Sequence, residues 1–364
     1  MIRNLLTRAN TNLRNARSYI RHLASRGDVP EGPIAYFDVS DPRLERYFYC
    51  LVKFFDIAGY RIVLRFRPRL LLNLRNYNDL LYGIRGLKIA FSAPAEPGIT
   101  ITDRAGLAEK GSALLIDTDY LAKNKGPGGF VFPYSMHPLV YHTGTHENVA
   151  GMREGRRNIR LFSYFANLAN YRRNEMETLF GKMDREKVAE AVLAYPDPEA
   201  LEILSEQADL AKLGMEGLML AVATDLRIPF EDWLPTLSRA SFFIAAPGVL
   251  MPYCHNLIEA MAVGTIPIIE YPEMFDPPLT DGVNCLAFRG AEALTDRIRD
   301  ALGMDEDRIK EMSDAAAAYY DRYFEPAAAV RRLEARLPEL DRIYLLAGHL
   351  SVEKLKSSAD RQSQ

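Results

Sequence analysis

SFFIAAPGVLMPYCHNLIEAMAVGTIPIIEYPEMFDPPLTDGVNCLAF, residues 241–288, is the stretch that decides the fold. It contains an apolar strand, a loop, a helix that opens at Cys254 and a second apolar strand after Gly264. The helix carries an acid, Glu259, near its start. In open parallel sheets, ligands bind beyond the carboxyl ends of the strands, and phosphate groups favour helix N-termini. The stretch therefore predicts an α/β unit with a phosphate-binding edge.

Length and composition limit the class of protein. The chain has 364 residues, enough for two domains, and its hydrophobic and charged fractions are those of an ordinary globular protein. A net charge of −3 argues against a general nucleic-acid binder. The three cysteines show no disulfide framework, which favours a reducing compartment, and we expect a cytoplasmic protein. The chain has neither an apolar run long enough to span a membrane nor the pattern of a signal peptide.

Residues 1–30 predict a basic amphipathic helix. Apolar residues recur at helical spacing, and the other face carries six arginines with no acid through residue 27. Such a helix fits two settings, either packed on the protein's own core or lying on an anionic membrane surface at the inner face of the membrane. Both interpretations stay open at this point.

Two α/β patterns follow in the chain. Residues 31–155 alternate apolar strands and helices, although 123–151 lacks a clear period and predicts a loop-rich region. A second pattern covers 156–325. A helix over 326–348 could cross back onto the first domain, and 349–364 is expected to be a polar, disordered tail. The predicted fold class is therefore α/β with two Rossmann-like domains.

The strands and helices expected within these patterns come from apolar runs and helical spacing. The strands are expected at 34–39, 60–66, 87–92, 113–117, 159–166, 218–223, 241–246 and 266–269. The helices are expected at 42–58, 70–82, 174–194, 230–238, from 254, at 291–302 and at 306–323.

Several motifs around the quoted stretch are those of a known family. Ser238 precedes an apolar strand, Pro247 stands in the loop, and the helix leads into Glu-Ala-Met-Ala-x-Gly-Thr-x-Pro, residues 259–267. These residues resemble the donor-binding half of GT-B glycosyltransferases, and most of all the exostosin-type family. The resemblance implies two Rossmann-like domains that face each other across a cleft. It also implies transfer of a sugar from a nucleotide sugar to a glycan or lipid-linked acceptor.

The sequence departs from the family pattern at the donor site. Gly248 and Asn256 stand where the family has Arg, and Cys254 stands where it has Ser. Met251 occupies the position of the second acid in retaining enzymes, so we expect an inverting transfer. The resemblance implies no cofactor besides the nucleotide sugar as substrate, and we expect no metal.

The leaving group of such a transfer is a nucleoside diphosphate, so the site must stabilise developing negative charge. The N–H groups at the start of the helix can do this. The resemblance implies that Glu259 accepts hydrogen bonds from the ribose hydroxyls, although a carboxylate here also favours the helix dipole. The other expected donor-binding residues are Pro247, Tyr253, Cys254, His255, Asn256, Arg172 and Arg173. The two arginines could replace the missing ones or lie on a solvated surface, and Cys254 could serve only in packing.

An inverting transfer also needs a general base near the acceptor hydroxyl. His137, His142 and His146 cluster beside Glu147 in the first half of the chain. The candidates for the base are His137, His142 and Asp38, which ends the first predicted strand. The histidines could equally belong to an ordinary ordered loop.

Two other functions remain open on the sequence alone. A catalytically silent GT-B-fold protein could bind a sugar nucleotide or a glycan, and the missing arginines favour this alternative. A metal-dependent GT-A-type transferase could use Asp117 and Asp119, which form an Asp-x-Asp after an apolar strand. The same two aspartates could simply cap a turn.

Overall fold

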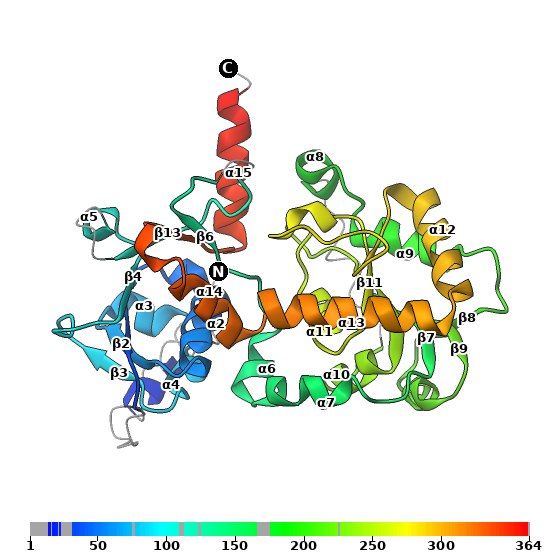
Figure 1. The fold of residues 1–364 in the computed structure, drawn as a ribbon, viewed down its shortest axis with the longest axis horizontal. Helices are drawn as coiled ribbons and strands as arrows, with labels where there is room; N and C mark the ends of the chain where they lie inside the picture. The colour runs from blue at the N-terminus through cyan, green and yellow to red at the C-terminus, as the bar shows by residue number, and fades with distance from the viewer. Residues whose placement is uncertain are drawn as a thin grey trace, which may run out of the picture. The chain divides into compact units, whose positions relative to one another are not determined.

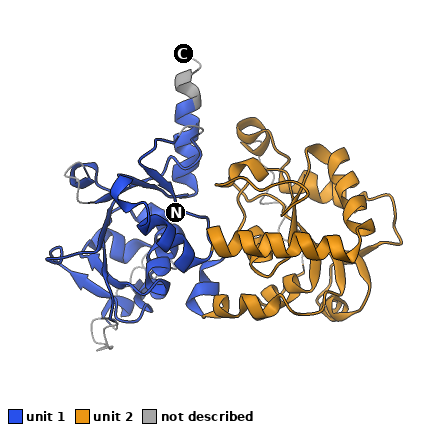
Figure 2. Ribbon diagram, viewed as in Figure 1, with its two compact units in different colours: residues 1–143, 325–364 blue, residues 144–324 orange. Residues whose placement is uncertain are grey.

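The computed structural model describes residues 14–15, 17–20, 22, 31–74, 77–108, 113–122, 125–165, 175–224 and 226–362. The chain divides into two compact units. Unit 1 comprises Met1–Thr143 and Glu325–Gln364, and unit 2 comprises Gly144–Phe324 (Figure 2). The sequence boundary was expected twelve residues later, after 155, because the short helices after 143 carry no strong periodic signal.

Unit 1 contains a seven-stranded parallel sheet in the order β3-β2-β1-β4-β5-β13-β6 (Figure 1). The strands are β1 (Ile34–Asp38), β2 (Arg61–Arg65), β3 (Lys88–Ala90), β4 (Ile99–Thr102), β5 (Leu114–Asp117), β6 (Gly129–Val131) and β13 (Arg342–Tyr344). The chain adds strands on one side of β1 and then crosses to the other side at β4. The carboxyl ends of β1 and β4 therefore form the topological switch point, where doubly wound sheets bind ligands.

The helices of unit 1 cover this sheet. They are η1 (Pro42–Leu44), α2 (Glu45–Ile57), α3 (Pro68–Asn73), α4 (Tyr77–Tyr82), α5 (Ala105–Ala108), α6 (Pro138–His142), α14 (Pro326–Glu334), η6 (Leu337–Glu339) and α15 (His349–Gln362). The aromatic face of α2 forms much of the core. The ring of Phe37 on β1 meets those of Phe48 and Phe55 edge-on, at centroid distances of 6.0 and 5.6 Å.

Unit 2 contains a six-stranded parallel sheet in the order β12-β11-β10-β7-β9-β8. The strands are β7 (Ile159–Phe165), β8 (Leu201–Leu204), β9 (Leu218–Thr224), β10 (Ala240–Ile244), β11 (Ile266–Ile269) and β12 (Leu286–Ala287). All five residues of β10 are buried, as expected for a central parallel strand covered on both faces. The chain crosses β7 between β9 and β10, which places the switch point of unit 2 at the carboxyl ends of β7 and β10.

The helices of unit 2 lie between and after these strands. They are η2 (Thr145–Asn148), α7 (Val149–Met152), α8 (Glu175–Phe180), α9 (Arg185–Leu193), η4 (Gln207–Gly214), α10 (Phe230–Ser238), α11 (His255–Ala262), η5 (Pro272–Met274), α12 (Gly290–Gly303) and α13 (Glu306–Tyr323). Two parallel doubly wound sheets in one chain confirm the expected fold class, α/β with two Rossmann-like units.

Arg157 organises the amino ends of the unit 2 strands. Its guanidinium donates to the carbonyl oxygens of Ser238, Ala240, Val263 and Gly264 and to the hydroxyls of Thr265 and Ser313. Burial lowers the pKa of Arg157 to about 10, so the group stays charged at neutral pH. Gly264, at φ 74°, leaves room for it, since a Cβ there would lie 2.9 Å from Arg157 Nη2.

The structure corrects the sequence prediction at the C-terminus. The helix expected over 326–348 stops at Glu334, and Arg342–Tyr344 forms strand β13 between β5 and β6. A three-residue strand is too short for a periodic signal, and only its partners stabilise it. Residues 349–362 form a helix, α15, instead of a disordered tail, and its first turns bury Leu350 and Val352.

Other differences concern short elements. Strands β4, β6 and β8 were not predicted, and β6 lies in the region expected to be loop-rich. The expected helix over 174–194 is two helices, α8 and α9, separated at Gly181, which has a φ of 61°. The expected helix over 70–82 is likewise α3 followed by α4.

Most of the predicted N-terminal helix lies outside the described residues. Those described between 14 and 22 are helical and pack on unit 1. Asn15 Nδ2 donates to the Leu72 carbonyl at 2.9 Å, and the ring of Tyr19 lies 5.8 Å from that of Tyr82. This part of the helix thus packs on the protein's own core, while Ile20 remains 64% exposed. In the part of the chain that the structure describes, no helix is long and apolar enough to cross a bilayer.

Candidate functional site

The loop between β10 and α11 forms the candidate donor site of unit 2. It closes on itself through a bond from the Gly248 N–H to the Pro252 carbonyl, at 3.2 Å. A Cβ on Gly248 would lie 2.6 Å from the Tyr253 carbonyl oxygen and 2.9 Å from that of Met251. The loop in this conformation therefore needs glycine at 248, and the arginine that the resembled family carries at this position does not fit it.

A buried arginine reaches the start of α11 from another element. Arg185, the first residue of α9, is only 4% exposed. Its Nε donates to the Pro247 carbonyl at 3.0 Å, and its Nη2 lies 3.4 Å from the Sγ of Cys254, the N-cap residue of α11. A guanidinium and a helix N-terminus thus meet at the carboxyl edge of the sheet, an arrangement that favours an anion.

The pKa of the Cys254 thiol reflects the positive potential at the start of α11. Burial raises its pKa, but Arg185, His255 and the Asn256 backbone N–H together outweigh burial, so the pKa is lower than that of an ordinary thiol. The carboxylate of Glu259 acts in the opposite direction and does not cancel this effect. The field at the start of α11 therefore stabilises negative charge.

Glu259 is completely buried and engaged by two side chains. Trp233 Nε1, delivered by α10, donates to Oε2 at 2.6 Å, and His255 Nδ1 lies 3.0 and 3.1 Å from the two oxygens. His255 is partly exposed, with 30% of its side chain accessible, and Trp233 is also only partly buried. A ribose hydroxyl could reach the Glu259 carboxylate only after His255 turned away. In this conformation Glu259 orients His255.

The other predicted donor residues have different surroundings. Tyr253 is 4% exposed and packs its ring 5.3 Å from that of Phe275, so it forms a wall of the loop. Pro247 is buried and accepts the bond from Arg185. Asn256, at 8% exposure, follows His255 in the first turn of α11. The predicted donor residues Arg172 and Arg173 lie outside the described residues.

At the switch point of unit 1, Asp38 ends β1 and is 6% exposed. Arg67 donates to both of its carboxylate oxygens, at 2.8 and 3.0 Å. The carbonyl of Asp38 accepts from the Thr102 hydroxyl at 2.9 Å, which joins β1 to β4. Of the predicted bases, Asp38 is the one at the ligand-binding edge of the sheet, but Arg67 must move before it can take a proton from an acceptor.

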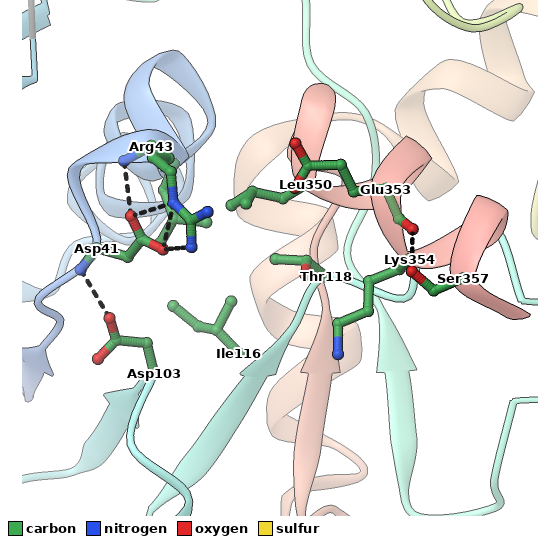
Figure 3. Close-up of a pocket in the computed structure, with 10 residues that line it drawn as sticks. Asp41, Arg43, Asp103, Ile116, Thr118, Leu350, Glu353, Lys354 and Ser357 are labelled. Atoms are coloured by element: carbon green, nitrogen blue, oxygen red, sulfur yellow. Dashed lines mark hydrogen bonds and ion pairs between the residues drawn. The ribbon is translucent and has the colours of Figure 1, made fainter.

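A cavity of about 490 Å³ lies at the same edge of unit 1 (Figure 3). It is bounded by the segments that follow β1 and β4, by the end of β5 and by one face of α15. The lining residues are Asp41, Arg43, Leu44, Asp103, Ile116, Thr118, Leu350, Glu353, Lys354 and Ser357. No sequence pattern indicated this cavity, because its wall depends on a helix that was expected to be disordered.

The histidines that were candidates for the base have other local contacts. His137 Nδ1 caps α6 by accepting from the Leu139 N–H at 3.3 Å. His142 packs near Gly83, which precedes β3, and burial and the Lys53 ammonium lower its pKa. His146 belongs to unit 2, whereas His137, His142 and Asp38 belong to unit 1.

The structure also shows the contacts of Asp117 and Asp119, the residues of the Asp-x-Asp alternative. Asp117 Oδ1 accepts from the Asp119 N–H at 2.9 Å, and its Oδ2 lies 3.3 Å from Arg342 Nη1. These contacts are those of a turn-capping aspartate. Across the described ranges, no group of three or more His, Cys, Asp and Glu side chains could hold a metal ion.

Two site residues were missed by the sequence analysis. Arg185 lies within a predicted helix and carries no local signal. Trp233 is the single tryptophan of the chain and follows β9, the strand beside β7. This position near the centre of the sheet could have indicated it as a site residue. The contact between His255 and Glu259 could be predicted from the sequence, since residues four apart share one face of a helix.

The chain is thus a two-unit doubly wound α/β protein with an anion-favouring helix N-terminus at the switch point of unit 2. No family model matches the chain, and no curated protein matches it. Many solved structures do align with it, among them the following three, each at 12% identity. HepE from Anabaena in complex with UDP has a TM-score of 0.46 and covers 84% of this chain and 100% of its own. An alpha-glucosyltransferase in complex with UDP and DNA has 0.43, at 84% and 100% coverage, and the lipopolysaccharide glycosyltransferase WaaG has 0.36, at 83% and 99%.

Proposed function

We propose that the protein is a glycosyltransferase that uses a nucleotide sugar and binds the donor diphosphate at the start of α11. The observation that carries this proposal is the buried guanidinium of Arg185, 3.4 Å from the N-cap thiol of an eight-residue helix at the switch point of unit 2. The charge and the N–H groups together suit a diphosphate. The motif in residues 259–267 supports a sugar nucleotide as its source.

The geometry suggests a division of roles within the donor site. In the first turn of α11, the Leu257 N–H already donates to the Cys254 carbonyl at 3.2 Å, so we assign the binding of phosphate oxygens to the dipole at the helix N-terminus. Arg185 adds positive charge from a buried position, where electrostatic interactions are strong. We propose that these groups meet the charge of the leaving diphosphate without a metal. His255, held by Glu259, then presents its ring to the bound nucleotide.

The proposed transfer is inverting, with the acceptor on unit 1. Met251, 4% exposed, stands where a retaining enzyme of the resembled pattern has its second acid. A single displacement requires a base at the acceptor hydroxyl. Asp38 is the candidate base whose position at the switch point of unit 1 supports this role.

The test is a thermal-shift and calorimetric screen of the full chain with UDP, GDP, ADP and CMP, followed by turnover with the matching nucleotide sugars. We expect one nucleotide to bind and its sugar conjugates to be hydrolysed or transferred. Absence of binding for all four nucleotides would overturn the proposed donor site.

A catalytically silent binder of a sugar nucleotide or glycan is the second candidate. Two observations favour it, the burial of the Glu259 carboxylate and the glycine at 248 in place of arginine. This candidate predicts nucleotide binding with no hydrolysis or transfer across the panel of nucleotide sugars. Turnover with any donor excludes it.

Replacing Glu259 by alanine should weaken both the site and unit 2. Loss of the carboxylate leaves the partly buried Trp233 N–H without its charged acceptor, which costs about 1–3 kcal/mol of unfolding free energy. It also frees His255, so nucleotide affinity should fall. Glu259→Gln keeps an acceptor oxygen and should preserve most of the stability. Calorimetry at a temperature where both variants are folded measures the affinity, and wild-type affinity in Glu259→Ala would exclude a role for this residue in binding.

We also propose that the basic N-terminal region contacts an anionic membrane surface. The exposed Ile20 beside a run of arginines supports this proposal. Ile20→Glu should lower binding to vesicles containing phosphatidylglycerol by about tenfold or more, since it removes an apolar contact and adds a repelled charge. Ile203→Glu on unit 2, where the isoleucine is 47% exposed, is the matched control and should bind as wild type. Equal binding of both variants in a co-sedimentation assay would contradict the proposal.

A further inference from the structure

We propose that the cavity at the carboxyl edge of unit 1 binds an uncharged saccharide, which serves as the glycosyl acceptor. The acceptor role rests on the proposed function, but the binding site stands on its own chemistry. It lies beyond the ends of β1, β4 and β5, next to the switch point at which doubly wound sheets take ligands.

The lining of the cavity combines apolar and polar groups, as a sugar ring requires. Leu44, Ile116 and Leu350 supply apolar surface for the C–H faces of the ring. Carboxylates, cations and the hydroxyls of Thr118 and Ser357 supply both acceptors and donors for its hydroxyl groups. The volume of about 490 Å³ falls within the range of about 300–1,000 Å³ typical of small-ligand sites.

The carboxylates on the β1 side are held rigidly before any ligand arrives. Asp103 Oδ2 accepts from the backbone N–H groups of Ser40 and Asp41, both at 2.8 Å, which ties the segment after β1 to the end of β4. Arg43 forms an ion pair with Asp41, and its Nη2 donates to Asp41 Oδ2 at 2.7 Å. Burial raises the pKa of Asp41, but Arg43 outweighs burial and the pKa is lowered, so this carboxylate stays ionised. Pre-ordered polar groups reduce the entropy lost on binding.

The opposite wall is one face of α15. Leu350, Glu353, Lys354 and Ser357 follow the spacing i, i+3, i+4, i+7, so they share one side of the helix. Figure 3 shows the Lys354 side chain extending from α15 toward the ends of the strands. Within the described residues, its ammonium group makes no ion pair or hydrogen bond, which leaves its three donors for ligand hydroxyls.

The charge of the lining decides which acceptor class fits. Three carboxylates, those of Asp41, Asp103 and Glu353, face two cations, those of Arg43 and Lys354. A diphosphate, such as that of a lipid-linked precursor, would find one more carboxylate than cations in this lining, and the Arg43 guanidinium is already paired with Asp41. An uncharged glycan meets no such charge penalty. The cavity therefore favours a neutral glycan over a lipid diphosphate.

The test compares saccharide binding to variants of the full-length protein. The probes are linear trisaccharides of glucose, galactose, mannose and N-acetylglucosamine, with inorganic pyrophosphate and farnesyl diphosphate as anionic competitors. Binding is followed by calorimetry and by saturation-transfer NMR. Lys354→Ala and Glu353→Ala should each lower the affinity for the preferred trisaccharide at least tenfold. Both residues are exposed, so these variants should fold.

Lys356→Ala is the matched control, because Lys356 is exposed on the same helix and does not line the cavity. It should bind the trisaccharide as wild type does. Absence of binding by any trisaccharide, equal loss in the Lys356 control, or tighter binding of farnesyl diphosphate through Lys354 would each overturn the proposal. Nucleotide affinity should be unchanged in Lys354→Ala. If saccharide binds but no nucleotide does, the proposed transferase function fails while this site stands.

Discussion

Replacing Arg157 by alanine is expected to destabilise unit 2 by about 3–5 kcal/mol, the largest effect on stability that we predict. The guanidinium serves four backbone carbonyls from two separate segments and two hydroxyls. Without it, all four carbonyls lose this charged donor, although those of Ala240 and Gly264 keep their bonds from the Thr265 and Ser313 hydroxyls. Arg157→Lys should not rescue the loss, since one ammonium group cannot span the acceptors that the planar fork reaches.

Urea unfolding followed by tryptophan fluorescence measures this effect in unit 2 alone, because Trp233 is the only tryptophan in the chain. Arg156→Ala is the control. Its side chain is 79% exposed and pairs with Glu216 at the surface, so its removal should change the unfolding free energy by about 0.5 kcal/mol or less. A similar small change for Arg157→Ala would mean that these hydrogen bonds do not hold the strand ends together.

Arg185→Met should reduce nucleotide affinity by at least about 30-fold, equivalent to about 2 kcal/mol. Methionine fills a similar volume but removes the buried charge beside the N-terminus of α11. It also releases the Pro247 carbonyl, which Arg185 Nε holds at 3.0 Å, so the loop loses part of its support. Arg185→Lys keeps the positive charge but lacks the planar guanidinium that reaches the loop, and it should recover part of the affinity. The comparison of the two variants therefore separates the effect of the charge from that of the hydrogen bond to the loop.

The matched control is Arg160→Met, on β7 of the same unit. Its side chain is 20% exposed and contacts Glu306 and the Met304 carbonyl, and it belongs to the amino end of β7. It should leave nucleotide affinity within about twofold of wild type. Calorimetry with the nucleotide selected by the thermal-shift screen gives both values. Unchanged affinity in Arg185→Met would remove the observation on which the donor site rests.

These two arginines show how unit 2 separates stability from binding. At the amino ends of the strands, Arg157 is used entirely by the protein's own carbonyls and hydroxyls. At the carboxyl edge, Arg185 lies beside the N-terminus of α11, and its charge adds to the helix dipole. The same residue type therefore completes the structure at one edge of the sheet and favours an anion at the other.

The central elements of the fold could be predicted from sequence. Strands β10 and β11 are continuous apolar runs, and α11 between them carries both its start residues and a motif, so their positions agree with the prediction. The sequence did not predict the short strands β4, β6, β8 and β13. A strand of three or four residues shows no reliable period, and neighbours far away in the chain stabilise it.

The site was only partly predictable. His255 and Glu259 share a face of α11 through their spacing, which is a local property. The partners that define their roles are not local. Trp233, on α10, donates a hydrogen bond to Glu259. Arg185, on α9, places a positive charge beside the start of α11. Nothing in the spacing of these residues along the chain signals that they meet.

By itself, the sequence determined the fold class, the strand–loop–helix of the donor site and the basic character of the N-terminus, because each follows from a local pattern of apolar, polar and charged residues. The tertiary structure alone decided that Glu259 is buried behind His255, that Arg185 stands at the start of α11, and that β13 and α15 complete unit 1 and its cavity. Those outcomes depend on which distant segments pack together. Burial and electrostatic contacts arise from that packing, and no periodicity within one segment encodes it.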